Sequence, residues 1–288
     1  MPTEYALPTE GMMANGAAPL KHFARIGPIA RQPEDLGLIW EHMRGPAPEG
    51  ESPAAPPKLL WSMDSGGLEV CKDISECMRT ALRGWHRAGF QVAQAAPEGF
   101  DFSRARRAFG EIMGYETGAL MPASSRFLAR LFGRASARRS PEFLANVLQS
   151  YRHSQKRYDL ALTEKHVLSA ALDAFLADNA VWLLPVTAVS AFKHLQPTRD
   201  QNGVRDYADP LLINGKPVNY FDALTSFVTP ISLTGHPVVT LPLGLDRNGL
   251  PVGGQLIGAK GSEAQLLRTA RLLQDELQAV VCPLLAQR

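Results

Sequence analysis

Apolar residues follow a helical period in some parts of the chain and a strand-like period in others. The first helical segment begins at Pro33 and carries an apolar stripe of Leu36, Ile39, Trp40 and Met43. Proline suits a first helical turn because its missing N–H would be unpaired there, and Gly45-Pro46 supplies a stop signal. Residues 46–57 then contain five prolines and no helical period, so we expect a loop.

A strand, a helix and a second strand follow this loop. Residues 59–62 and 90–92 are short apolar runs, and residues 74–88 between them have helical spacing that ends at Gly89. This order predicts a parallel crossover unit. Residues 101–178 are almost wholly helical in pattern, including a long segment from Pro141 to Leu176, and they predict a helical layer.

Strand character returns in the last third of the chain. We expect strands at residues 181–184, 238–245 and 252–257, and the Asn248-Gly249 turn favours a hairpin between the last two. A closing helix has its apolar stripe at Leu266, Ala270, Leu273 and Leu277. The predicted fold class is therefore α/β, a mixed β-sheet flanked by helices, with these C-terminal strands and helix spanning 181–278.

Composition narrows the class of protein. The chain has 288 residues, 45% hydrophobic, and a net charge of +2, which gives no reason to expect a nucleic-acid partner. Its three cysteines, Cys71, Cys77 and Cys282, match neither a zinc site nor a secreted disulfide framework, so we expect the cytoplasm. No export signal is visible at the start, and no apolar run is long enough to span a membrane.

Three groups of residues occur in an order typical of one enzyme family. The first contains Pro2-Thr3, Pro8, Gly11, Gly27 to Arg31 and Glu34 to Leu36; the second is the strand-helix-strand unit at 59–92. The third runs from Phe227 to Leu273 and contains Thr229-Pro230, Leu233 to Gly235, Pro237, Leu241-Pro242, Gly244, Gly249 to Gly253, Gln255 to Gly258 and Leu266-Leu267. Together they resemble the amidase-signature family over nearly the whole chain.

This resemblance implies the hydrolysis of carboxylic amides by a serine nucleophile, a relay serine in a cis peptide and a lysine base. In the family these residues and the glycine-rich oxyanion loop all precede a Pro-Thr pair, which is Pro2-Thr3 here. We therefore assign no catalytic residue in this chain and expect a single, incomplete amidase-signature domain over 1–288 that lacks its N-terminal part. Without a nucleophile and a base it should be inactive alone.

The matched glycines and prolines are turn residues that we interpret mainly as scaffold. If any of them line a substrate pocket, the candidates are Thr229, Thr234, Gly235 and His236, because turns held by a rigid sheet commonly carry function. The ligand would be a small-molecule amide in the completed enzyme. No cofactor and no metal are predicted, since the histidines are scattered and His153 and His166 are too far apart to share a helical metal face.

Two other patterns point to different chemistry. Ser190 and Lys193 have the Ser-x-x-Lys spacing of penicillin-recognising enzymes, but the companion elements of those enzymes are absent. The pair follows Pro185, so we expect it to lie in a loop. Between Asp101 and Leu160 there are eleven Lys and Arg against five Asp and Glu. We interpret this excess as a charged helical face kept in water, rather than as a nucleic-acid site.

Two alternatives to an inactive amidase domain remain open. One is a non-catalytic protein that binds a partner, either a second copy of itself or a separate N-terminal chain, because a sheet that lacks strands should leave an open edge. The other is a fragment of an active amidase whose gene continues upstream of the codon for Met1.

Overall fold

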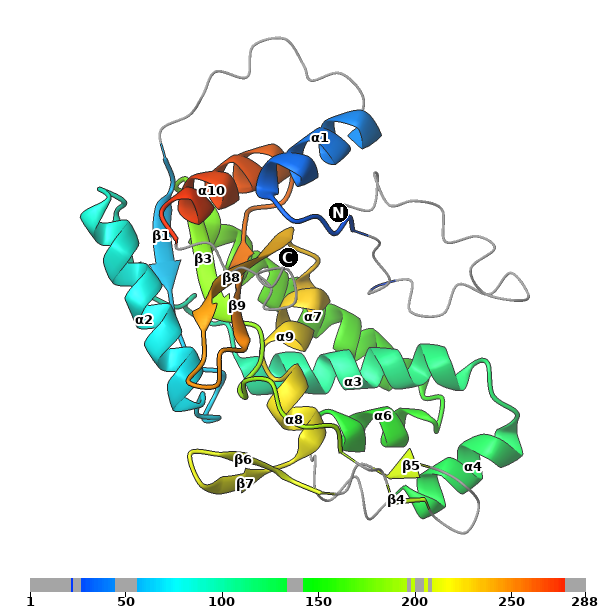
Figure 1. Cartoon of the computed structure of the whole chain (residues 1–288). Helices are drawn as coiled ribbons and strands as arrows, with labels where there is room; N and C mark the ends of the chain where they lie inside the picture. Colours follow the sequence, from blue (N-terminus) through cyan, green and yellow to red (C-terminus); the bar gives the residue numbers. More distant parts are fainter. Residues whose placement is uncertain are drawn as a thin grey trace.

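The computed structural model describes residues 22, 27–44, 56–133, 142–195, 198–199, 205–206 and 209–277. Its centre is a five-stranded sheet with helices on both faces (Figure 1). The strands of this sheet are β1 (Lys58–Trp61), β2 (Val92–Gln94), β3 (Ala180–Pro185), β8 (Val238–Leu245) and β9 (Pro251–Ile257). Most of the predicted Pro-rich loop, residues 46–55, lies outside the described residues.

The sheet is mixed, as the sequence predicts. Its strand order is β2-β1-β3-β9-β8, with parallel pairing from β2 through β1 to β3 and antiparallel pairing from β3 through β9 to β8. The β8–β9 hairpin closes where the Asp246 carboxylate accepts hydrogen bonds from the backbone N–H groups of Asn248 and Leu250, both at 2.8 Å. The hairpin predicted from Asn248-Gly249 is therefore confirmed.

The crossover between β1 and β2 is made by α2 (Lys72–Arg87), and it too is confirmed. The second strand begins at Val92, two residues later than the sequence predicts. The reason is that the Phe90 N–H still bonds the carbonyl of Trp85 at 3.0 Å, so it belongs to the end of the helix and is not free to pair in a sheet.

Alternate residues of β3 point into two separate cores. Val181 and Leu183 pack with α2 and with α10 (Glu263–Asp275) on one face. Trp182 and Leu184 pack on the other face against the C-terminal part of α7 (Gln155–Leu176) and against Phe227. Helix α1 (Pro33–Arg44), confirmed as predicted, lies against α10 (Figure 1). All six residues of β3 are buried, which explains its unbroken apolar sequence.

The predicted helical layer is confirmed as α3 (Phe102–Gly118), α4 (Ala123–Phe132), α6 (Leu144–Ser150) and α7. The long segment predicted from Pro141 to Leu176 is broken between α6 and α7, where His153 has a left-handed φ of 58°. The Ser150 carbonyl accepts the His153 N–H at 2.8 Å and closes this turn. Because of this break, α6 packs against α3. The two helices can approach closely because Gly114 has no side chain where Val147 and Ser150 pass it.

The basic residues of this layer are exposed or partly exposed where the structure describes them, as in Arg104, Arg107 and Arg152, and Arg106 is the exception to the predicted solvated face. Arg106 is only 6% exposed, and its guanidinium donates to the carbonyl of Ser65 at 2.7 Å and to the carboxylate of Glu142. Arg157 of α7 pairs with the buried carboxylate of Glu111 on α3. Burial of the Arg106 and Glu111 charges is tolerated because each is paired and hydrogen-bonded.

Several elements between β3 and β8 are not predicted. They are β4 (Thr198–Arg199), β5 (Arg205–Asp206), β6 (Leu211–Ile213), β7 (Lys216–Val218), α8 (Tyr220–Thr225) and α9 (Val228–Thr234). Asn214-Gly215 turns β6 into β7 with positive φ at both residues, a hairpin signal that sequence reasoning missed. The segment interpreted as a turn from Thr229 to His236 is helical through Thr234, and only its last residues form a turn.

We predict opposite effects of alanine at two helical glycines. A Cβ at Gly114 would lie 2.8 Å from the Cβ of Ser150 and against the backbone of Val147, whereas a Cβ at Gly84 would meet nothing within 4 Å. Gly114→Ala should therefore destabilise the protein by about 1–3 kcal/mol through overpacking. Gly84→Ala should stabilise it by up to about 1 kcal/mol through helix propensity. Urea unfolding midpoints of the two variants test this, and equal shifts would refute the close α3–α6 contact.

Candidate functional site

Three of the four candidate pocket residues, Thr234, Gly235 and His236, lie at the junction of α9 and β8, and Thr229 lies in the first turn of α9. Thr229 and Thr234 are on α9, and both are buried. The Thr229 hydroxyl donates to the carbonyl of Thr225 at the end of α8, and the Thr234 hydroxyl donates to the carbonyl of Ile231 within α9, each at 2.8 Å. Gly235 caps the helix in the left-handed conformation with φ 74°, which turns the chain so that His236 precedes β8. A residue with a Cβ would be strained at this cap.

His236 contacts the helical layer. Its side chain has no exposed surface, and its Nε2 lies 2.9 Å from Oδ1 of Asp173 on α7. The contact is short, but neither ring nitrogen has a hydrogen-bond partner of good geometry in the described part of the chain. A neutral ring with its proton on Nε2 is the tautomer that suits the contact.

The surroundings of His236 disfavour its charged form. Burial is the larger cause and the nearby Lys260 ammonium the next, and they lower the pKa of His236 from 6.5 to about 4 in spite of the opposing effect of Asp173. The side chain is therefore neutral near pH 7. A neutral, buried imidazole beside an ion pair could act as a hydrogen-bonding group, but Asp173 and Lys260 already satisfy each other's charge.

A serine and a lysine that the sequence does not associate meet beside this histidine. Lys260, which follows β9, donates from Nζ to Oγ of Ser169 on α7 and to Oδ2 of Asp173, the latter at 2.9 Å. The Ser169 hydroxyl donates in turn to the carbonyl of Thr234 at 3.3 Å. No sequence signal could have found this pair, because 91 positions separate the two residues and neither belongs to a recognisable motif.

The hydrogen-bond directions show what this pair can do. A serine nucleophile needs a base that accepts its proton. Here the Lys260 ammonium donates to the Ser169 oxygen, and the serine proton is directed at a backbone carbonyl. Ser169 is also 7% exposed, which leaves little room for a carbonyl substrate to approach its oxygen. The group of Ser169, Asp173, His236 and Lys260 therefore serves to fix the α9–β8 junction against α7.

A cavity of about 510 Å³ lies beside the junction and is lined by Pro237, the residue after His236. Its walls come from α1, the segment preceding α1, the start of β8 and α10, and include Pro237, Trp40 and Leu266. None of the four candidate residues lines it or the cavities of about 980, 660 and 350 Å³ elsewhere in the described part of the chain. Their role in substrate binding stays a prediction.

The other sequence patterns do not gather into a site. Residues 186–195, which include Ser190 and Lys193, form neither helix nor strand, so the two side chains do not share a helical turn and the predicted loop is confirmed. The described His, Cys, Asp and Glu residues form no group of three that could hold a metal ion. Nor is any described helix both long and apolar enough to cross a bilayer.

The motif residue Gln255 and its neighbour Gly254, which lies between two of the motif segments, have clear structural roles. The side-chain amide of Gln255, on β9, donates to the carbonyls of Pro185 at 2.9 Å and Phe227 at 3.2 Å. It therefore joins the end of β3 to the start of α9. A Cβ on Gly254 would lie 2.7 Å from Leu243 Cδ1 and 3.1 Å from Leu183 Cδ1, so a side chain there would collide with the core. These contacts support the interpretation of the motif as scaffold.

Comparisons with known proteins agree with this fold. The model of the amidase family matches residues 1–267. AtzE of Pseudomonas sp. (strain ADP), a 1-carboxybiuret hydrolase subunit, is 28% identical over 290 residues, covering 93% of this chain and 57% of that protein. A glutamyl-tRNA(Gln) amidotransferase subunit of Cenarchaeum symbiosum (strain A) is 23% identical, with coverages of 90% and 56%.

Solved structures give the same result for the fold. One described as "Crystal structure of amidase" aligns with a TM-score of 0.62 at 19% identity, over 88% of this chain and 52% of that one. Another, described as an "unexpected vestigial protein complex" that "reveals the evolutionary origins of an s-triazine catabolic enzyme", has the same TM-score and identity, with coverages of 91% and 55%. The chain thus spans about half the length of these relatives.

The low pKa of His236 predicts a loss of stability in acid. Its folded-state pKa of about 4 lies below the ordinary 6.5, so the unfolded chain binds the proton more tightly. The stabilisation is complete above pH 6.5 and is lost as the pH falls toward 4, by about 3 kcal/mol. Urea unfolding between pH 7 and pH 4 should show this loss in the wild type and a correspondingly smaller one in His236→Asn. Parallel pH profiles would contradict the assignment.

Proposed function

Because the chain belongs to the amidase family, we propose that it takes part in the hydrolysis of carboxylic amides and that residues 1–288 by themselves do not catalyse it. The family match over residues 1–267 is the observation that carries the reaction class. The proposal gives this chain the role of scaffold and substrate wall, while the nucleophile and base come from a segment that corresponds to none of its residues.

The arrangement at Ser169 supports inactivity of the isolated chain. Acyl transfer needs an activated nucleophile and hydrogen-bond donors aimed at the developing oxyanion. Ser169 receives a hydrogen bond from its lysine neighbour instead of losing a proton to it. Ser190 and Lys193, the other pair considered, lie in a segment without helical geometry. We retain Thr229, Thr234, Gly235 and His236 as proposed substrate-wall residues of the completed enzyme, since the last three form one helix-to-strand turn and Thr229 lies on the same helix.

The purified chain should release no ammonia from a simple amide such as benzamide above the rate of a buffer blank. Removal of the nucleophile and base leaves only slow residual assistance in a serine hydrolase. Ser169→Ala and Lys260→Ala serve as matched variants, and each should release ammonia at the same rate as the wild type and the blank. Turnover by the wild type that disappears in Ser169→Ala would overturn the proposal and make Ser169 the nucleophile.

The reading frame upstream of the Met1 codon tests where the catalytic segment resides. A lysine followed by a glycine- and serine-rich stretch, continuous in frame with Pro2-Thr3, would assign the active protein to a longer chain. An in-frame stop would instead favour a separate chain or a non-catalytic role. The cytoplasm stays the proposed compartment, supported by free thiols at Cys71 and Cys77.

A non-catalytic, partner-binding role is the second candidate, and the edge of the sheet favours it. β8 ends the strand order, so its outer edge has no partner strand within the described residues. Val238 and Leu245, near the two ends of this strand, are 41% and 45% exposed. A long edge with apolar residues is a template for pairing with another strand. The two curated relatives described above are both named as subunits, which suits association with another chain.

A lysine on this edge tests the second candidate. Val238→Lys should weaken any concentration-dependent association about tenfold, because a lysine ammonium would have to be buried against the incoming strand. Leu212→Lys on the β6–β7 hairpin is the matched control, since Leu212 is also exposed but lies in a different sheet. Sedimentation velocity at several concentrations provides the measurement. A wild type that stays monomeric throughout would rule out self-pairing at β8.

A further inference from the structure

The largest of the described cavities lies on the α2 face of the sheet, away from the α9–β8 junction. Its volume is about 980 Å³, and its walls come from α2, β1, β2 and the loop that follows β1. Helix α2 packs on the face of β3 that carries Leu183, whereas α7, which contacts His236, packs on the face that carries Trp182. The sheet therefore separates this cavity from the residues of the proposed substrate wall.

One side of the cavity is apolar. Trp61, Leu82 and Val92 line it, and all three belong to or border the core formed by α2 and α10. Leu82 is 5% exposed, so it is a fixed part of the wall. Trp61 is the last residue of β1 and is half-buried, which leaves part of its indole ring available to a ligand. Aromatic and aliphatic walls of this kind commonly bind the apolar body of a small molecule.

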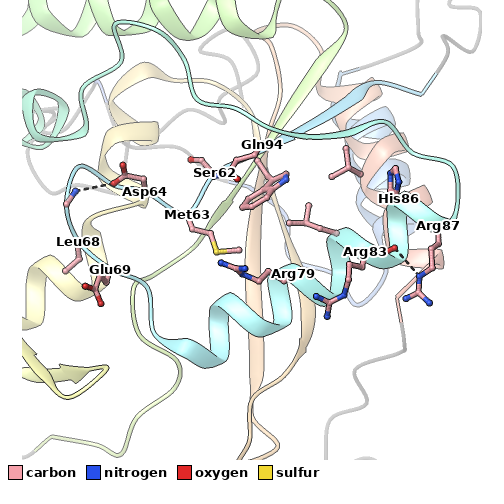
Figure 2. Close-up of a pocket in the computed structure, with 14 residues that line it drawn as sticks. Ser62, Met63, Asp64, Leu68, Glu69, Arg79, Arg83, His86, Arg87 and Gln94 are labelled. Atoms are coloured by element: carbon pink, nitrogen blue, oxygen red, sulfur yellow. Dashed lines mark hydrogen bonds between the residues drawn. The ribbon is translucent and has the colours of Figure 1, made fainter.

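The other side carries a row of positive charge. Arg79, Arg83 and Arg87 line the cavity from α2. They recur every four residues, so their side chains leave one side of the helix at intervals of about 6 Å along its axis. Figure 2 shows Arg79 reaching toward Met63 across the cavity. The bonds that Arg83 and Arg87 make are internal to α2, to Thr80 Oγ1 and to the Arg83 carbonyl.

None of these three arginines forms an ion pair with an acid in the described part of the chain. The two carboxylates that line the cavity are engaged elsewhere. Asp64 accepts the backbone N–H groups of Gly66 at 2.8 Å and Gly67 at 3.2 Å. Glu69 pairs with Lys216 at 2.7 Å, and this hydrogen bond is the main reason why the pKa of Glu69 is lowered. The cavity therefore combines an apolar wall with three guanidinium groups that outnumber the two carboxylates lining it, one of which is paired with Lys216.

We propose that this cavity is a binding site for a small organic anion, with a carboxylate or phosphate held by Arg79 and Arg83 and an aromatic or aliphatic body against Trp61 and Leu82. A guanidinium presents two parallel N–H groups that match either anion. The volume fits a ligand of ordinary metabolite size. The apolar wall favours a compact ligand with a hydrophobic part over a free inorganic anion.

Isothermal titration of the full chain tests the proposal with three probes of one shape. 1-Naphthoate and 1-naphthyl phosphate carry the two anions, and 1-naphthalenemethanol is their neutral counterpart. At least one anion should bind at least about tenfold more tightly than the alcohol, because charge-assisted hydrogen bonds to arginine add to the apolar contact. The tighter of the two identifies the headgroup. Raising the salt concentration should weaken the binding of the anions and leave the binding of the alcohol unchanged.

Variants locate the binding. Arg79→Gln and Arg83→Gln should each weaken the binding of the preferred anion about tenfold and leave the binding of the alcohol unchanged. Both side chains are exposed, so the fold should tolerate the changes. Arg152→Gln removes the same charge from an exposed position in the helical layer and should have no effect. The proposal is overturned if no anion binds at millimolar concentration, if inorganic phosphate binds as tightly as naphthyl phosphate, or if the three variants behave alike. None of these measurements depends on amide hydrolysis.

Discussion

Every layer of this protein is positioned by β3, a strand that is buried on both faces and paired on both edges. It pairs in parallel with β1 and antiparallel with β9, so it is the strand at which the parallel part of the sheet meets the hairpin. Because its alternate residues enter two cores, α2 and α10 must cover one face and α7 the other. The positions of the α9–β8 junction and of the α2 cavity follow from this division.

Buried polar side chains connect the layers where apolar packing alone would not fix their register. Arg106 joins α3 to the loop after β1, and Gln255 joins β9 to β3 and α9. Both side chains are costly to bury and are satisfied by specific partners, so each favours one arrangement of the layers over others. The polar residues around the candidate site are thus explained by architecture before any chemistry is assigned to them.

The chain combines a well-packed centre with a sheet edge, at β8, that has no partner strand in the described residues. Residues of β3 and α2 reach zero exposure, as in the middle of a larger domain, whereas β8 keeps a free edge in the described structure. This contrast agrees with a family match to about half the length of the relatives. Around the α9–β8 junction, the hydroxyl groups of Ser169, Thr229 and Thr234 donate to backbone carbonyls, so these polar side chains hold the scaffold together.

The sequence by itself determined the elements whose signals are local. The proline start of α1, the Asn248-Gly249 hairpin, the apolar run of β3 and the order of the family motifs are all properties of neighbouring residues, and they predicted the mixed sheet. Tertiary structure alone decided which distant side chains meet. Ser169 with Lys260, His236 with Asp173, and the arginine row of α2 with Trp61 are brought together by the crossing of elements over the sheet. No local pattern encodes such contacts, because burial and charge compensation depend on the neighbours that folding supplies.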